Sequence, residues 1–390
     1  MDLSGVLILA SLLIGLLVVV MLAVLLRRQE ATRRELAQLR ARLHSERLLT
    51  QEVAQASRAA RALEADGEQE PVSYDRAAPI HHLAVVMNPV KYPQPERFRA
   101  EVEQAMRRSI GSIQLSFYET TRDDAGHGQA TQAVRDGADL VLAAGGDGTV
   151  REVASALAGG PVRMGIIPGG TGNLLARNLD VPLENVQAAV EHAITGIDHR
   201  IDVGWLQSGM SVQAAERAPK RIFLVISGYG ADAEIVGATD VKLKRRFGWP
   251  AYVLAGLGKL AGRSHEVVVS LPGGTEQILQ ARTVLIGNVG KLPGGITLMP
   301  DATIDNGHLE ILALGWRGAA GFGQILTQVV NPRLSAGPRL STMQRFLTRS
   351  VTVASSKPMP VQLDGDTEAP ATHLIAAVEP AALIIRAGDR

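Results

Sequence analysis

Two glycine-rich turns carry the clearest chemistry in this sequence. The first, at residues 145–149, follows the apolar run DLVLAA, and the second, at residues 168–173, follows VRMGII. Glycine at a strand-to-helix junction lets backbone amides approach phosphate oxygens, and the positive end of the next helix favours negative charge. Either turn alone is compatible with a plain tight bend, but two of them on successive strands predict one phosphate-binding crevice.

Two carboxylates in turns could accept a proton during phosphoryl transfer. That reaction needs positioned reactants, neutralised phosphate charge and an acceptor for the hydroxyl proton, and a carboxylate can be this acceptor. Asp147 lies on a loop within the first glycine turn, and Asp366 ends the sequence LDGD. Because DGD is ordinary turn chemistry, the residues alone favour a type I turn at Asp366 over a catalytic role.

The segments around the glycine turns predict an α/β nucleotide-binding domain over residues 81–203. Short β-rich runs alternate with helical patterns, which is typical of a largely parallel sheet. The predicted strands are residues 83–88, 113–119, 139–144 and 162–167, and the predicted helices lie near residues 95–108, 127–135 and 150–157. The P-loop ending GKS or GKT and the GxGxxG fingerprint after the first strand are missing, which disfavours the common nucleotide folds.

Residues 204–390 predict a β-rich second domain that would hold the substrate. The sequence there consists of β-like runs separated by glycine, proline and polar turns, among them FLVISG, RTVLIGN and HLEILAL. This pattern is typical of a β-sandwich. The C-terminal segment could return to the first domain.

The first 28 residues predict a transmembrane anchor. Within residues 5–26 the only polar side chain is Ser11. As a helix this run would span roughly 33 Å, which matches a bilayer core of roughly 30 Å. Arginines follow the run and none precedes it, so the positive-inside rule places the rest of the chain in the cytoplasm. A cleaved signal peptide would need a basic start and a shorter apolar stretch. The expected location is the cell membrane, as a single-pass protein.

Composition fits this layout and limits the chemistry. The 390 residues exceed one ordinary core, and residues 29–80 predict a helical spacer that ends in a proline-containing linker. A formal net charge of +1 gives no general attraction to nucleic acid. The absence of cysteine excludes disulfides and thiolate nucleophiles. No feature argues for or against oligomerisation.

The two glycine motifs also carry a family resemblance. GGDGTVREV followed by IIPGGTGNLLARNL is similar to the catalytic domain of diacylglycerol and sphingosine kinases, and the likeness extends over roughly residues 83–366, including GYGADAEIV and VQLDGD. The resemblance implies ATP and Mg²⁺ as cofactors. It also implies a set of residues around ATP, namely Asn88, Thr121, Gly145, Gly146, Asp147, Gly148, Thr149, Glu152, Thr171, Gly172 and Asn173. The segment at residues 90–93 departs from the Ser, Gly and Lys that often follow Asn-Pro in this family.

The same resemblance assigns roles outside the nucleotide site. The family carries LDGE where this chain has LDGD, and its final carboxylate is a proposed base, which favours Asp366 as general base and Asp147 as organiser of Mg-ATP. Because Asp366 is one methylene shorter than Glu, the alternatives are a closer approach of the hydroxyl, an intervening water, or Asp147 as the base. Asp232 resembles a residue that contacts a lipid headgroup. Some bacterial members hold a structural Mg²⁺ at positions that match Thr303, Asn306 and His308, with Asn306 in place of an Asp.

Together these features predict a membrane-anchored lipid kinase that transfers the γ-phosphate of ATP to a lipid hydroxyl, with diacylglycerol the first candidate acceptor. A sphingoid base or another lipid is an alternative acceptor. An NAD kinase-like enzyme shares the GGDG turn, although PGGTGN, LDGD and the anchor favour a lipid. An inactive membrane scaffold that binds nucleotide or lipid is the alternative outside the enzymes, supported by the change from Glu to Asp in LDGD.

Overall fold

The computed structural model describes residues 79–230, 264–273, 275–292, 296–318, 320–321, 323–325 and 340–388. The chain divides into two units, Met1–Asp75 and Arg76–Arg390, and the described residues belong to the second. The predicted anchor at residues 5–26, nearly all of the spacer, and Asp232 lie outside the described residues. Among the helices of the described part, none has the length and apolar character needed to cross a membrane.

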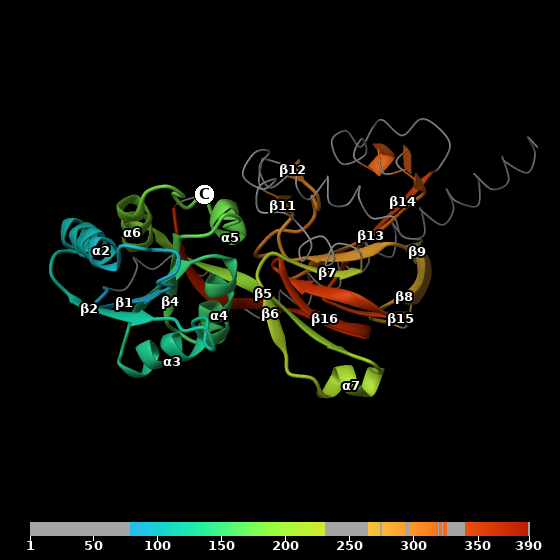
Figure 1. Ribbon diagram of the computed structural model, residues 1–390, viewed down its shortest axis with the longest axis horizontal. Coiled ribbons are helices and arrows are strands. Elements are labelled where there is room, and N and C mark those ends of the chain that lie inside the picture. Colours follow the sequence, from blue (N-terminus) through green and yellow to red (C-terminus); the bar gives the residue numbers. More distant parts are fainter. Residues whose placement is uncertain are drawn as a thin grey trace, which may run out of the picture. The chain divides into compact units, whose positions relative to one another are not determined.

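The first half of the described chain is an α/β domain, as the sequence predicts. Its strands are parallel and lie in the order β4-β3-β1-β2. Helices α2 and α6 cover one face of this sheet, and α3 and α4 cover the other (Figure 1). The elements are β1 (His82–Met87), α2 (Pro95–Ile110), β2 (Gln114–Glu119), α3 (His127–Arg135), β3 (Leu140–Gly145), α4 (Asp147–Leu157), β4 (Arg163–Pro168), α5 (Leu174–Asn178) and α6 (Val186–Thr195).

Burial explains why these runs form strands and helices. All residues of β1 and β3 are buried, as expected for central strands covered by helices on both faces. In α2 the buried side chains recur at helical spacing on one face, from Phe98 to Met106, and Pro95 starts the helix where its missing N–H costs nothing. The helix ends at Gly111, whose φ of 80° suits glycine.

The second half is a β-rich domain of the sandwich-like kind that the sequence predicts. A second apolar core, which includes Tyr229, Ile311, Val353 and Leu374, lies among its strands. The elements are β5 (Ile197–Gly209), α7 (Val212–Arg217), β6 (Arg221–Phe223), β7 (Ile226–Gly230), β8 (His265–Leu271), β9 (Thr275–Ala281), β10 (Thr283–Gly287), β11 (Lys291–Leu292), β12 (Ile296–Thr297), β13 (Leu309–Trp316), β14 (Ser341–Thr348), β15 (Ser350–Leu363) and β16 (Asp366–Ala387).

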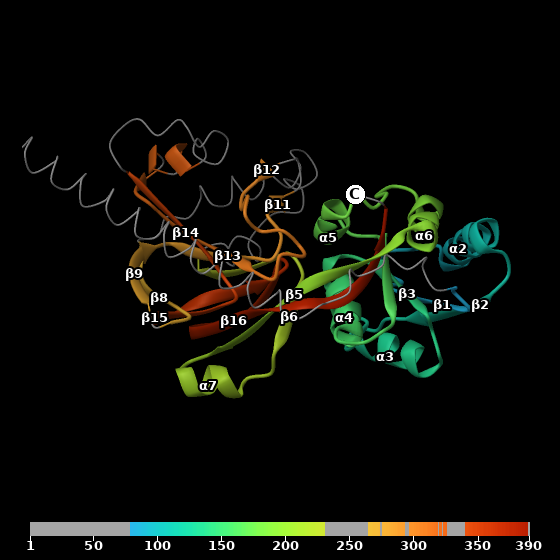
Figure 2. The ribbon, with the colours of Figure 1, turned by 180° about the vertical axis from the view of Figure 1, so that it is seen from behind.

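The long strand β16 connects the two halves. It pairs antiparallel with β15 and β5, and near its end Ile385 pairs in parallel register with Met164 of β4. Both views show β16 extending from the β-rich half into the α/β half (Figures 1 and 2). The C-terminal segment therefore returns to the first sheet. Because β16 begins at Asp366, the LDGD hairpin is attached to the same strand that joins the nucleotide-type sheet.

Candidate functional site

The two glycine turns lie against each other at the carboxyl ends of β3 and β4. The backbone N–H of Gly169 donates to the carbonyl oxygen of Gly145 at 2.7 Å. A Cβ atom added to Gly170 would lie 2.8 Å from the Cα of Gly146, closer than real Cβ contacts. Glycine is therefore required at position 170, because a side chain there would collide with the backbone of the first turn.

Asp147 ties the second glycine turn to the first. Its carboxylate accepts hydrogen bonds from the backbone N–H groups of Asn173 at 3.0 Å and Leu174 at 2.5 Å. Burial raises the pKa of Asp147 to about 6, the charge of Asp364 adds to this effect, and the bound amides oppose it. The residue was predicted on a loop but is the first residue of α4, because Gly146 serves as the N-cap. Asp147 therefore organises both turns.

Asn173 closes the second turn on itself. Its backbone adopts φ 48°, and its side-chain amide accepts from the N–H of Gly170 and donates to the carbonyl of Gly170, both at 2.9 Å. Asparagine tolerates this left-handed conformation better than most residues. A Cβ on Gly172 would lie 2.5 Å from the Asp147 carboxylate, so this glycine is needed for the Asp147 contact. Thr171 is exposed at the tip of the turn.

Asn88 belongs to the same edge of the sheet. Its backbone N–H donates to the carbonyl of Ala144 at 2.9 Å, and its side-chain amide donates to the hydroxyl of Thr149 at 3.4 Å. Gly145 leaves room for Thr149, because an added Cβ would lie 2.6 Å from the Thr149 Cβ. The structure thus brings Asn88 and Thr149 together beside the first glycine turn.

Thr121 lies in a separate turn after β2. Its hydroxyl accepts from the backbone N–H of Asp124 at 3.1 Å, and its own N–H donates to the Asp124 carbonyl at 2.9 Å. The turn approaches the site at Gly126, where an added Cβ would lie 3.6 Å from the Thr149 carbonyl oxygen. The hydroxyl of Thr121 therefore shapes its own turn.

Asp366 lies beside the first turn of α4. Its Oδ2 would be 3.1 Å from a Cβ added to Gly148, the residue that follows Asp147. The same oxygen accepts from the guanidinium of Arg151 at 2.7 Å, and 56% of the Asp366 side chain remains exposed. The carboxylate of Glu152 lies 3.9 Å from the guanidinium groups of both Arg151 and Arg221. The two predicted carboxylates, Asp147 and Asp366, therefore lie at the start of one helix.

The LDGD hairpin differs from the predicted type I turn. Asp364 and Gly365 have φ values of 48° and 94°, as in the type I′ turn that suits the twist of a two-residue hairpin. The buried Asp364 carboxylate accepts from three successive backbone N–H groups, those of Leu224, Val225 and Ile226, at 2.8 to 3.0 Å. Burial raises the pKa of Asp364, although Arg151 and the amides oppose the rise. Asp364 thus anchors the hairpin that presents Asp366.

Sequence reasoning missed Lys91 and Tyr92, which occupy the segment that departs from the family pattern. The Lys91 side chain passes over both glycine turns: its Cβ would lie 3.2 Å from a Cβ added to Gly169, and its Cε 3.9 Å from one added to Gly146. The hydroxyl of Tyr92 donates to the Ile167 carbonyl at 2.9 Å and so holds this segment on β4. A lysine directly after the first strand was the available signal.

The residues predicted to hold a structural Mg²⁺, Thr303, Asn306 and His308, lie in one turn before β13. The Asn306 amide donates to the Asp301 carbonyl and accepts from the His308 N–H, both at 3.0 Å. The backbone N–H of Asn306 lies 3.5 Å from the Thr303 carbonyl. Within the described ranges, three or more His, Cys, Asp or Glu side chains do not gather in a group that could hold a metal. The Mg²⁺ at this turn stays a prediction.

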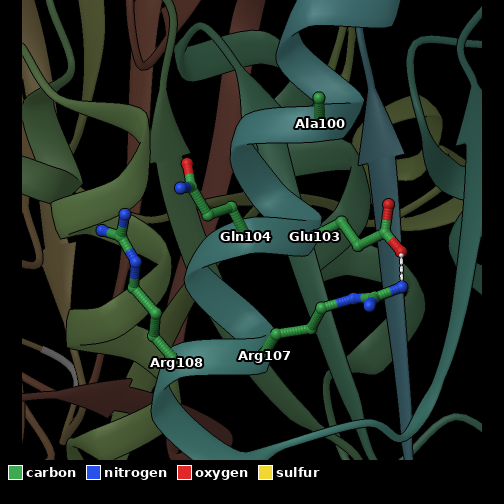
Figure 3. Close-up of a pocket in the computed structure, with 5 residues that line it drawn as sticks. All are labelled: Ala100, Glu103, Gln104, Arg107 and Arg108. Carbon is green, nitrogen blue, oxygen red and sulfur yellow. Dashed lines mark hydrogen bonds and ion pairs between the residues drawn. The ribbon is translucent and has the colours of Figure 1, made fainter.

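A surface pocket of about 360 Å³ lies elsewhere, on α2. Its lining residues all come from that helix, and two of them, Glu103 and Arg107, form an ion pair along the helix (Figure 3). The side-chain amide nitrogen of Gln187 donates a hydrogen bond to Gln104 Oε1 at 2.9 Å. The pocket contains none of the glycine-turn or hairpin residues, so it is not part of the candidate site.

Comparison with known families agrees with this architecture. Residues 82–206 match the diacylglycerol kinase catalytic domain, and residues 224–387 match the YegS C-terminal NAD kinase beta sandwich-like domain. The diacylglycerol kinase of Bacillus subtilis is 30% identical over 283 residues, covering 70% of this chain and 86% of that protein. A Xanthomonas oryzae protein named "Probable lipid kinase YegS-like" is 30% identical over 297 residues, covering 70% and 88%.

A solved structure shares the fold. The crystal structure of a diacylglycerol kinase from Bacillus anthracis superimposes with a TM-score of 0.61 at 20% identity, covering 80% of this chain and 98% of that one. The match to the diacylglycerol kinase catalytic domain, together with the relatives of 30% identity, makes the protein a kinase of the lipid kinase class. The chain belongs to the diacylglycerol kinase family, which confirms the resemblance found in its glycine motifs.

Proposed function

We propose that this lipid kinase transfers the γ-phosphate of ATP to a lipid hydroxyl, with diacylglycerol as the acceptor. The observation that supports this proposal best is the position of Asp366 beside Gly148, at the start of the helix that follows the first glycine turn. A proton acceptor on β16 thereby lies beside the helix that begins in the first glycine turn, which would hold the phosphates. These are the two parts that phosphoryl transfer to a hydroxyl requires.

The residues present fit a nucleotide with its metal. A Cβ added to Gly170 would fill the space between the two glycine turns, at Gly146. The Lys91 side chain passes over this space. Mg²⁺, which prefers oxygen ligands and phosphates, would be held by the phosphates together with Asp147, whose carboxylate oxygens keep lone pairs beyond those that the two amides use. When bound, the metal would neutralise part of the negative charge of the ATP phosphates.

In the proposed reaction Asp366 takes the proton of the acceptor hydroxyl. The hydroxyl oxygen forms a bond to the γ-phosphorus, the bond from that phosphorus to the β–γ bridging oxygen breaks, and ADP leaves. Asp147 keeps the two turns in register, because its carboxylate holds the backbone of Asn173 and Leu174. The chain thus contributes positioning and one proton acceptor.

The membrane anchor is part of the proposal. The apolar run at residues 5–26 would hold the enzyme at the cell membrane, with the kinase part in the cytoplasm where ATP is available. Curated relatives named diacylglycerol kinase or lipid kinase support a lipid acceptor over the NAD kinase-like alternative. A sphingoid base stays the second candidate lipid, because the residue expected to meet the headgroup, Asp232, belongs to the same pattern in sphingosine kinases.

The test is transfer of radiolabel. The full chain is incubated with γ-labelled ATP, Mg²⁺ and vesicles that carry diacylglycerol, sphingosine or neither, and a parallel reaction contains NAD. Labelled phosphatidic acid is the expected product. Label in sphingosine phosphate would move the acceptor to the second candidate, label in NADP would overturn the lipid assignment, and no label in any product would favour a scaffold. Flotation of the full chain with vesicles, compared with a chain that lacks residues 1–26, tests the anchor.

A further inference from the structure

Arg151 is a buried arginine in the helix that starts the site. It lies four residues after Asp147 in α4, so the two side chains project from the same face of the helix. Only 6% of the Arg151 side chain is exposed. A buried guanidinium is costly unless its donors are satisfied by acceptors or anions, so its partners indicate its role.

Its two nearest partners belong to the LDGD hairpin, and the carboxylate of Glu152, the next residue in α4, lies 3.9 Å from the guanidinium. One guanidinium nitrogen donates to the Leu363 carbonyl at 2.8 Å and another to Asp366 Oδ2 at 2.7 Å. Burial lowers the pKa of Arg151, but the charges of Asp364 and Asp366 more than compensate and raise it overall. The planar fork of arginine can hold a carbonyl and a carboxylate at once, which the single ammonium of lysine cannot do with the same geometry.

This arrangement fixes the distance between the phosphate cradle and Asp366. The helix begins in the first glycine turn, and Arg151 holds the hairpin to that helix through two hydrogen bonds. Because Arg151 engages only Oδ2 and more than half of the Asp366 side chain is exposed, the other oxygen is left to meet a substrate. Asp366 is one methylene shorter than Glu, so its placement depends on where the hairpin backbone is held.

We propose that Arg151 is a positioning residue for the reaction: it holds Asp366 Oδ2 so that the other carboxylate oxygen faces the acceptor hydroxyl. The inference rests on the proposed function of Asp366 as base. It adds a role for a buried arginine in α4, which fixes the position of the short Asp366 side chain relative to the nucleotide.

The test is a double-mutant cycle in the full chain. Arg151→Lys keeps the positive charge near Asp364 and should therefore keep the fold, but it cannot hold both acceptors. We expect kcat for lipid phosphorylation to fall about 10²-fold while KM for ATP stays within about threefold, the pattern of a misplaced catalytic group. In the Asp366→Asn background the same lysine substitution should cost little further activity, since the group it positions is gone.

A matched control separates positioning from general stability. Arg163 pairs with Asp198 at 2.9 Å and is 13% exposed, at the end of β4 opposite the second glycine turn. Arg163→Gln should lower the melting temperature without changing kcat. Wild-type kcat in Arg151→Lys, or equal losses from this substitution with and without Asp366, would overturn the positioning role. Full activity of Asp366→Asn alone would instead show that Asp366 is not the general base, and the proposed function on which this inference rests would fail.

Discussion

The carboxylate of Asp147 accepts a hydrogen bond from the backbone N–H of Leu174 at 2.5 Å, so the first residue of α4 holds the first residue of α5. The two helices start at the ends of neighbouring parallel strands. One buried side chain therefore holds the two glycine turns together. Its protonation state should be visible in both stability and catalysis.

The pH dependence of unfolding should carry a contribution from Asp147. Burial raises its pKa from 3.8 to about 6, so the folded protein binds this proton more tightly than the unfolded chain. The stability that it contributes is present below about pH 4 and is lost as pH rises through about 6. Urea unfolding of wild type and Asp147→Asn at closely spaced pH values should show wild type losing stability relative to the variant across this window. Parallel curves would contradict the raised pKa.

Closing the glycine cradle should weaken ATP binding. In Gly170→Ala the new methyl group would lie 2.8 Å from the Cα of Gly146. Overpacking of about 1–3 kcal/mol corresponds to about 5- to 150-fold in affinity, so KM for ATP should rise in that range. Gly323→Ala is the matched control, because an added Cβ there has no atom within 4 Å among the residues that the structure describes. Equal KM values in the two variants would place the nucleotide elsewhere.

Local pattern was enough to predict the α/β half and the positions of its two glycine turns. Continuous apolar runs predicted the strands, and glycines at the ends of these runs predicted the turns. The start of α4 was predicted at residue 150 but lies at Asp147, because Gly148 has a poor intrinsic helix propensity that the tertiary contacts of Asp147 override. The sequence therefore located the turns correctly but not the helix that begins within one of them.

Contacts between distant residues could not be predicted in the same way. Arg151 and Asp366 are 215 residues apart, and strand pairings between distant segments, such as those of β16 with β4, β5 and β15, bring their halves together. Within LDGD the family resemblance singled out the outer carboxylate, Asp366, and the sequence contained no sign that Asp364 would be buried against the backbone of Leu224 and Ile226. A DG turn contains no hydrophobic periodicity. The sequence therefore could not distinguish Asp364, which anchors the hairpin, from Asp366, which is exposed at the site.

Lys91 should contribute charge to the phosphate site. Its side chain passes over both glycine turns and lies in the segment where the family pattern is absent. Lys91→Ala should raise KM for ATP about tenfold with a smaller change in kcat, because an exposed charge-assisted hydrogen bond to phosphate is worth about 1.5 kcal/mol. Lys91→Arg should restore most of the affinity. If KM for ATP is unchanged in Lys91→Ala, the lysine does not reach the phosphates.

The two carboxylates of the site should separate in kinetics. Loss of a general base costs about 10²- to 10⁴-fold, so Asp366→Asn should lower kcat by that amount and leave KM for ATP nearly unchanged. Asp147→Asn keeps one acceptor oxygen but loses one of two amide bonds, so it should raise KM for ATP as well as lower kcat. Glu368→Gln is the control for Asp366, since this neighbour on β16 forms an exposed ion pair with Arg221 at 3.2 Å. A reversed split, with the kcat defect confined to Asp147→Asn, would make Asp147 the base.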